Sequence, residues 1–222
     1  MSIPNWADAL GQIQNHVIHV STPGRSGTGF LIASSKKEEV VGIATALHVV
    51  SHAHEWGEPI RITHYPSGKI VLLKEADRSI HWNEKADSVL VRFAKGKLPL
   101  PDKPMALAPR DKYIREGVEL GWCGYPSIYP TKLCFFSGRV SAWLEREDAY
   151  LIDGVAINGV SGGPAFSYPV VIVGMVTAYI PSRATGEPLP GVALVRAITP
   201  YVYLFEQLKR KPPKPASDSE IG

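Results

Sequence analysis

Ser161 lies between glycines in the segment GVSGGP at 159–164, and this spacing suits a nucleophile. A serine hydroxyl that attacks a carbonyl must project from a tight turn, with backbone N–H groups aimed at the oxygen that becomes negative. Glycine allows the sharp bend and lets the backbone approach a substrate without a Cβ in the way. The same segment could be a simple glycine-rich turn between strands, so its partners elsewhere in the chain decide between the two interpretations.

A serine nucleophile needs a base to take its proton, and the base needs a third group to orient it. His48 ends the small apolar run IATAL, and Asp87 directly precedes the strand-like run SVLV. Each has a plainer explanation, since His48 could be a core histidine and Asp87 could cap a turn. Two other acids compete less well, because Asp77 lacks a following apolar run and Asp102 lies among prolines. The chain therefore offers histidine, aspartate and serine in that order.

The segment SGTGFLI at 26–32 adds a glycine turn that feeds a strand before the histidine. With this piece the chain resembles the trypsin/chymotrypsin-like serine proteases, and more closely the protease domain of the bacterial HtrA/DegP-like branch. That branch has a GTGFLI-like strand, a TAxHV histidine, an aspartate near two hydrophobic residues, and GxSGGP, in this order. The resemblance extends from about residue 14 to residue 208. It includes four weaker likenesses, at GYP (124–126), FSGRVS (136–141), VGMVT (173–177) and GVA (191–193).

The resemblance implies a role for each of these residues. His48 would be the general base and acid, Asp87 would orient it, and Ser161 would be the nucleophile of a serine endopeptidase that works through an acyl-enzyme. The backbone N–H groups of Gly159 and Ser161 would form the oxyanion hole. Thr177 aligns with a serine of the family that supports the buried aspartate. No cofactor and no metal is implied.

The resemblance also places a pocket for the substrate residue before the scissile bond. Val155 would lie at its base, where no acid is present, so a small or medium apolar residue is expected there rather than Lys or Arg. Tyr179 stands where many relatives have glycine, which narrows the expected pocket. The residues expected to line the walls are Thr177, Ala178, Tyr179, Gly191 and Ala193.

The residue before Ser161 bears on how the protein is regulated, and the order of the three candidate residues bears on which other functions are possible. Val160 stands where digestive relatives carry an aspartate, so no trypsin-style zymogen switch is expected. HtrA-like relatives order their loops through oligomers and ligands, which predicts an activating protein partner or a homo-oligomer. The alternative function is a trypsin-like fold that binds a peptide or protein without turnover. An α/β-hydrolase is excluded because its order is Ser, Asp, His, and no histidine follows Ser161.

The fold class expected is all-β, with two six-stranded antiparallel barrels of the trypsin-like kind and short N-terminal and C-terminal helices. With 222 residues, one such domain is long enough to bury a core. We expect a helix from Asn5, as N-cap, to Gln14, and strands at 16–21, 29–34, 40–46, 61–64, 69–75 and 88–93. The domain would span 1–210, with a first barrel at about 14–95, a linker at 95–111, a second barrel at 112–198, a helix at 199–210, and a disordered tail at 211–222, too short for a PDZ domain.

Composition excludes several other classes. The net charge of +3, with Lys and Arg spread out except at the tail, gives no reason to expect a nucleic-acid partner. The longest apolar runs fall well short of the ~18–20 residues of a membrane span. The first residues carry no basic start and no apolar core of a secretory signal, which predicts a cytoplasmic protein that acts on protein or peptide substrates.

The cysteines and the histidines near His48 could also be structural or metal-binding groups. Cys123 and Cys134 could bridge adjacent strands in an exported chain, but in a cytosolic chain buried thiols are expected. His48, His52 and His54 lie close in sequence, but His48 and His52 lack the intervening Glu of a His-Glu-x-x-His zinc site. A metal there would also occupy the proposed base, so the two interpretations compete.

Overall fold

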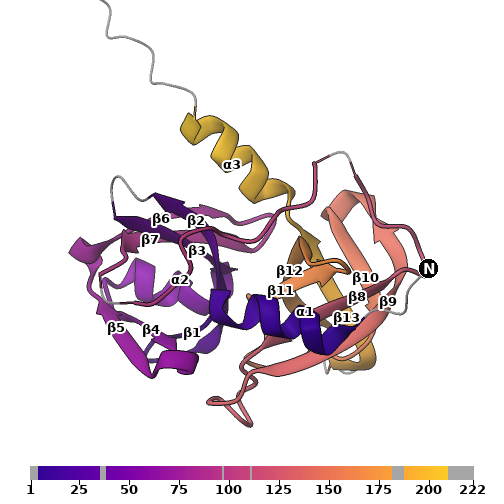
Figure 1. The fold of residues 1–222 in the computed structure, drawn as a ribbon, viewed down its shortest axis with the longest axis horizontal. Helices are drawn as coiled ribbons and strands as arrows, with labels where there is room; N and C mark the ends of the chain where they lie inside the picture. Colours follow the sequence, from indigo (N-terminus) through magenta and orange to yellow (C-terminus); the bar gives the residue numbers. More distant parts are fainter. Residues whose placement is uncertain (1–4, 36–38, 97, 111, 182–187, 210–222) are drawn as a thin grey trace, which may run out of the picture.

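The protein consists of two β-sheet units side by side, with one helix at each end of the chain (Figure 1). The structure, a computed structural model, describes residues 5–35, 39–96, 98–110, 112–181 and 188–209, and describes only the backbone of 35, 178–181, 188–190 and 205–209. The expected tail at 211–222 therefore lies outside the described residues. The trypsin-like double-barrel architecture expected from the sequence is confirmed.

The helices and strands follow one another along the chain with short connections, apart from the segment at 95–118 between the two units. The helices are α1 (Trp6–Ile13), α2 (Leu47–Glu55) and α3 (Thr199–Lys209). The strands are β1 (Val17–Ser21), β2 (Ser26–Ser35), β3 (Val40–Ala46), β4 (Ile60–His64), β5 (Lys69–Leu73), β6 (Arg78–Asn83), β7 (Ser88–Ala94), β8 (Glu119–Gly124), β9 (Cys134–Leu144), β10 (Ala149–Asp153), β11 (Pro164–Ser167), β12 (Val171–Pro181) and β13 (Pro188–Ala197).

The first unit has seven strands among the described residues, in the order β5-β4-β1-β2-β3-β7-β6, rather than the six expected. The additional strand is β6, whose sequence RSIHWN has no clear apolar run and gives a weak strand signal. Strands β5 and β6 do not pair, so the ladder stays open between them. The guanidinium of Arg78 spans this gap, donating to the carbonyls of Ala53, Glu58 and Leu73 at 2.7–3.0 Å.

The second unit is a closed six-stranded barrel in the order β10-β13-β12-β11-β8-β9, as expected. Its interior is filled by large side chains such as Trp122 and Phe166, which are fully buried. The barrel is therefore a packed core rather than a pore. It forms a rigid scaffold, and the loops outside it can hold functional residues.

The terminal helices fasten the two units to each other. Asn5 caps α1 by accepting from the N–H of Asp8, as predicted, and Trp6 packs against Phe135 and Phe166 of the second barrel. From α3, Tyr201 reaches between the units, and burial raises the pKa of its phenol. Among the described helices, none is long and apolar enough to cross a membrane.

The two cysteines are free thiols. Cys123 pairs with Phe135 and Cys134 pairs with Gly124, so the cysteines are one residue out of register on adjacent strands and face opposite sides of the sheet. Complete burial raises the pKa of the Cys123 thiol, which makes it unreactive. This agrees with the expectation of buried thiols for Cys123, whereas Cys134 is only half-buried.

Candidate active site

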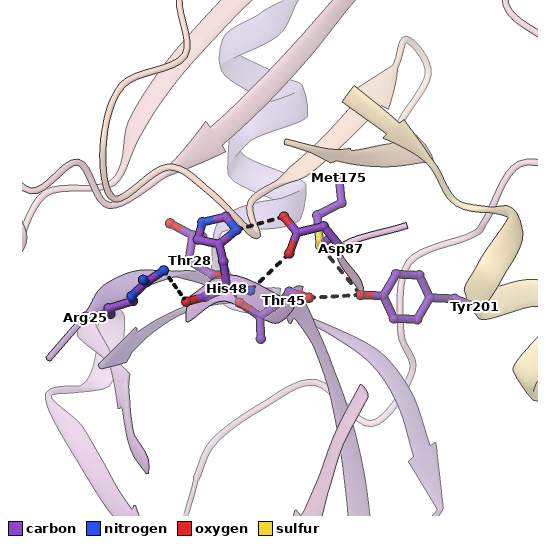
Figure 2. Close-up of polar contacts among 7 residues, drawn as sticks. All are labelled: Arg25, Thr28, Thr45, His48, Asp87, Met175 and Tyr201. Atoms are coloured by element: carbon purple, nitrogen blue, oxygen red, sulfur yellow. Dashed lines mark hydrogen bonds and ion pairs between the residues drawn. The ribbon is translucent and has the colours of Figure 1, made fainter. Parts of the chain in front are cut away.

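His48 and Asp87 are in direct contact at the junction of β3 and α2 (Figure 2). The Nδ1 atom of His48 lies 2.7 Å from Oδ2 of Asp87, and the backbone N–H of His48 donates to Oδ1 at 3.0 Å. The backbone at Asp87 is also held, because the N–H of Leu47 donates to the Asp87 carbonyl at 3.0 Å. Two hydrogen bonds to one carboxylate thus hold both the imidazole and the start of its helix.

This contact determines which ring nitrogen is free. A carboxylate accepts hydrogen bonds, so the proton of the neutral imidazole lies on Nδ1 and leaves Nε2 as a base. The side chains of His48 and Asp87 are 36% and 27% exposed, so their ion pair is open to solvent screening and adds little to stability. Orientation of the imidazole is the main effect of the pair.

The segment 157–160 forms a tight turn ahead of Ser161. The N–H of Val160 donates to the carbonyl of Ile157 at 3.1 Å, and Gly159 has a φ of +92°, the arrangement of a type II turn. A Cβ at Gly159 would lie 2.5 Å from both Tyr125 O and Ser127 N. Only glycine therefore fits here, on grounds of both conformation and space.

Hydrogen bonds fix the peptide planes of this turn. The carbonyl of Asn158 accepts from the N–H of Ser127 at 2.8 Å, and the carbonyl of Val160 accepts from the N–H of Gly163 at 2.9 Å. Because a trans peptide is planar, the N–H groups of Gly159 and Ser161 point away from those carbonyls. Neither N–H donates to any group in the part of the chain that the structure describes. Two adjacent donors are thus left available beside the serine.

The turn is seated against the segment that carries the histidine. A Cβ added at Gly162 would collide with the Thr28 carbonyl and the Thr45 hydroxyl, and the N–H of Thr28 donates to the Ser161 carbonyl at 2.8 Å. Thr45 is three residues before His48 on the same β3–α2 segment. Among the described residues, the Ser161 hydroxyl makes no hydrogen bond to the imidazole, so the fold brings serine and histidine into one region without linking them directly.

Comparison with known proteins agrees with this geometry. Residues 27–175 match the family of the trypsin-like peptidase domain. The chain belongs to the trypsin-like peptidase family. The match includes all of β2 after Ser26, the His48 and Asp87 positions, and the turn with Ser161. No curated protein sequence matches the chain.

Several solved protease structures share the fold. An inactive form of Rv3671c from M. tuberculosis H37Rv, carrying a serine-to-alanine substitution, is 16% identical with a TM-score of 0.66, over 96% of this chain and 98% of that one. A serine endoprotease from Yersinia pestis is 17% identical with a TM-score of 0.69, over 95% and 69% of the two chains. The HtrA-type protease AlgW, solved with a decapeptide, is 16% identical with a TM-score of 0.70, over 92% and 67%. At this identity the likeness concerns the fold, and family and fold together support a serine protease.

The residues expected to line the substrate pocket lie along β12, β13 and the segment after β10. Val155 is 48% exposed, and its carbonyl accepts from the indole N–H of Trp122 at 3.3 Å. Gly191 has a φ of +76° with open space around its Cα, and Ala193 is fully buried and pairs with Tyr179. The side chains of Ala178 and Tyr179 lie outside the described residues.

The hydrogen bond expected from Thr177 to Asp87 is absent. The Thr177 hydroxyl is buried and has no partner among the described residues, and the Asp87 carboxylate accepts two hydrogen bonds from His48. The competing acids have other partners, since Asp77 accepts from the N–H of Lys74 and Asp102 from the ammonium of Lys95, each at 3.0 Å.

The other two histidines of the metal hypothesis are directed elsewhere. Nδ1 of His52 lies 3.0 Å from the carboxylate of Glu58, and the ring of His54 packs edge-on against Trp82 at 4.9 Å. No group of three metal-ligating side chains is present in the described ranges.

Two residues beside the site had no sequence signal. Arg25 donates to the His48 carbonyl at 2.9 Å, and the Tyr201 hydroxyl lies 3.1 Å from Thr45 O (Figure 2). The same hydroxyl lies 3.0 Å from Val89 O. Tyr201 thus ties α3 to the two strands that lead to His48 and from Asp87. Its position on the first turn of a terminal helix gives no indication of this contact, which depends on how the two units pack.

Proposed function

We propose that the protein is a serine endopeptidase that uses Ser161 as nucleophile, His48 as general base and acid, and Asp87 as the group that orients His48. The observation that carries the proposal is the turn at 157–161, where two N–H groups are left unbonded while the carbonyls around them are held. A glycine-rich connection between strands has no need of such an arrangement. A site for a developing oxyanion requires it.

The first half of the reaction forms an acyl-enzyme. Oγ of Ser161 attacks the peptide carbonyl as Nε2 of His48 takes its proton, and the carbonyl oxygen becomes an oxyanion that accepts from the N–H groups of Gly159 and Ser161. Asp87 accepts from Nδ1 and stabilises the imidazolium. When the carbonyl re-forms, the C–N bond breaks and Nε2–H gives its proton to the leaving amine.

The second half releases the product. Water loses a proton to Nε2 of His48 and attacks the ester carbon, and the same two N–H groups bind the oxyanion again. The Ser161–acyl bond then breaks, the proton returns from His48 to Oγ, and the carboxylate product leaves.

Protein or peptide substrates with a small or medium apolar residue before the scissile bond fit the pocket residues best. Val155 brings no charge to the base of the expected pocket, and Ala193 leaves space on one wall. Thr177, Ala178, Tyr179 and Gly191 complete the proposed lining. The HtrA-type fold also makes a homo-oligomer or an activating protein partner part of this proposal.

Labelling with a fluorophosphonate tests the proposal. Intact-mass analysis should find one phosphonyl adduct on the wild-type protein and none on Ser161→Ala, with a strongly reduced rate on His48→Ala. Ser167→Ala, at the serine that ends strand β11 six residues further along the chain, is the matched control and should label like the wild type. A folded wild-type protein that takes up no adduct would contradict the enzyme and favour the binding module instead.

A further inference from the structure

Thr28 uses each of its polar groups in a hydrogen bond, and three of the four contacts reach the second barrel. Its N–H donates to Ser161 O at 2.8 Å, and its hydroxyl donates to Gly159 O at 2.8 Å. The hydroxyl also accepts from the N–H of Tyr125 at 2.9 Å, and its carbonyl accepts from the Thr45 hydroxyl at 2.6 Å. Figure 2 shows Thr28 and Thr45 beside the His48–Asp87 pair.

The hydroxyl contact acts on the Gly159–Val160 peptide, the last peptide of the 157–160 turn. The carbonyl of Gly159 belongs to the same peptide plane as the N–H of Val160, which closes the type II turn by donating to Ile157 O at 3.1 Å. Holding that carbonyl therefore fixes the plane between the two free N–H groups. This plane joins the peptide that carries the Gly159 N–H to the peptide that carries the Ser161 N–H, so Thr28 braces the backbone between the two donors.

A hydroxyl suits this position because it must accept from one backbone group and donate to another. Thr28 is fully buried, and so are Gly159 and Tyr125. A Cβ at Gly124 would lie only 2.7 Å from Oγ1 of Thr28, so the backbone packs directly on the hydroxyl. Loss of the hydroxyl would leave a carbonyl and an N–H unsatisfied inside the protein.

We propose that the Thr28 hydroxyl is a positioning group that sets the geometry of the oxyanion hole from the first barrel. The inference rests on the proposed function. It assigns the first β-sheet unit a part in transition-state stabilisation beyond carrying His48 and Asp87. Thr28 itself does not touch the substrate, and it acts through the carbonyl of Gly159.

The test compares Thr28→Val, which keeps the shape and removes the hydroxyl, with Thr28→Ser, which keeps the hydroxyl. The control is Thr63→Val, at a buried threonine of β4 whose hydroxyl makes no hydrogen bond among the described residues. Two rates are measured: phosphonylation by a fluorophosphonate, and hydrolysis of p-nitrophenyl acetate with kcat and KM separated. Thermal unfolding is followed in parallel.

We expect Thr28→Val to lower kcat and the phosphonylation rate by about 10- to 100-fold with little change in KM, since the donors are misdirected rather than removed. Thr28→Ser should stay within about threefold of the wild type, and Thr63→Val should keep both rates. If Thr28→Val does not fold, Thr28→Cys replaces it, because a thiol is a weak donor on a longer bond, and the same loss is expected.

The outcomes separate the two proposals. A wild type labelled at Ser161, together with a folded Thr28→Val or Thr28→Cys that reacts at the wild-type rate, would overturn the role of Thr28 alone. An equal loss in Thr63→Val would overturn it as well, since a general effect of burial would then account for the data. A wild type that takes no label would overturn the proposed function and this inference with it.

Discussion

At the scale of single residues, Gly159 combines a backbone conformation that requires glycine with an N–H group proposed to bind the oxyanion. Its φ of +92° and the 2.5 Å approach of an added Cβ to Tyr125 O and Ser127 N leave no room for alanine. Alanine keeps the N–H but must shift the turn, so we expect Gly159→Ala to misdirect this donor and lower kcat by up to about 10²–10³-fold, the loss found when one oxyanion donor is removed. Steady-state hydrolysis of an activated ester measures it.

The control for this prediction is Gly68→Ala. Gly68 also has a positive φ, +66°, but an added Cβ would meet nothing within 4 Å. It should therefore keep wild-type kcat and lose only about 1 kcal/mol of stability. Equal kcat in the two variants would contradict the assignment of the Gly159 N–H.

Asp87 supports a second prediction at this scale, because its carboxylate accepts two hydrogen bonds from His48. An asparagine has one acceptor oxygen, so Asp87→Asn must lose one bond and favours the imidazole tautomer with its proton on the wrong nitrogen. We expect kcat to fall about 10³–10⁴-fold near pH 7. Asp77→Asn, at an exposed acid with a local backbone contact, should leave kcat unchanged. A loss of less than tenfold in Asp87→Asn would refute the orienting role.

At the scale of elements, Arg78 closes the gap that the strand ladder leaves in the first unit. Its guanidinium holds three carbonyls, from the last turn of α2, the approach to β4 and the end of β5. Hydrogen bonds to a charged group contribute about 1.5–3 kcal/mol each, so Arg78→Met should lower the free energy of unfolding by roughly 2–4 kcal/mol. Urea denaturation measures the change.

Arg61→Met is the matched control for this prediction, because Arg61 is an exposed arginine on strand β4 of the same unit. It should change the free energy of unfolding by less than about 0.5 kcal/mol. If Arg78→Met proved no more destabilising than Arg61→Met, the inference that Arg78 stabilises the gap between β5 and β6 would be wrong.

At the scale of the whole molecule, three buried histidines make stability depend on pH. Burial lowers the pKa of His16, His19 and His64. Just below the ordinary value of about 6.5 the unfolded chain binds these protons while the native protein does not, so stability is full above that value and is lost as pH falls through it. Each histidine contributes a slope of up to about 1.4 kcal/mol per pH unit.

His19 allows this dependence to be tested at the contact between the two units. Its ring, on β1, lies 5.8 Å from that of Tyr65 and 5.9 Å from that of Tyr125, which follows β8, and Nε2 has no partner among the described residues. His19→Phe should reduce the slope of unfolding free energy between pH 7 and 5, measured by urea denaturation at several pH values. An unaltered slope in His19→Phe would argue against burial of His19 as a cause of the pH dependence.

The sequence by itself determined the local parts of this protein. The glycine-bounded serine, the histidine after β3 and the aspartate before β7 were readable because each depends on a few neighbouring residues and on a known order along the chain. The cap of α1 by Asn5 and most of the strands were readable for the same reason, since periodicity and turn chemistry act over short distances. Strand β6 was not predicted, because its sequence RSIHWN has no clear alternation of apolar and polar residues.

Only the tertiary structure decided which distant groups meet. The bond from Thr28 to Gly159 joins residues 131 apart in sequence, and the bond from Tyr201 to Thr45 joins residues 156 apart. Such contacts follow from how two curved sheets pack, and a hydroxyl in a strand carries no local mark of the carbonyl it will meet. The expected bond from Thr177 to Asp87 is absent for the same reason, because the packing of strand β12 leaves the buried Thr177 hydroxyl without a partner among the described residues. Residue types thus fixed the candidates for chemistry, while packing fixed their hydrogen-bond partners.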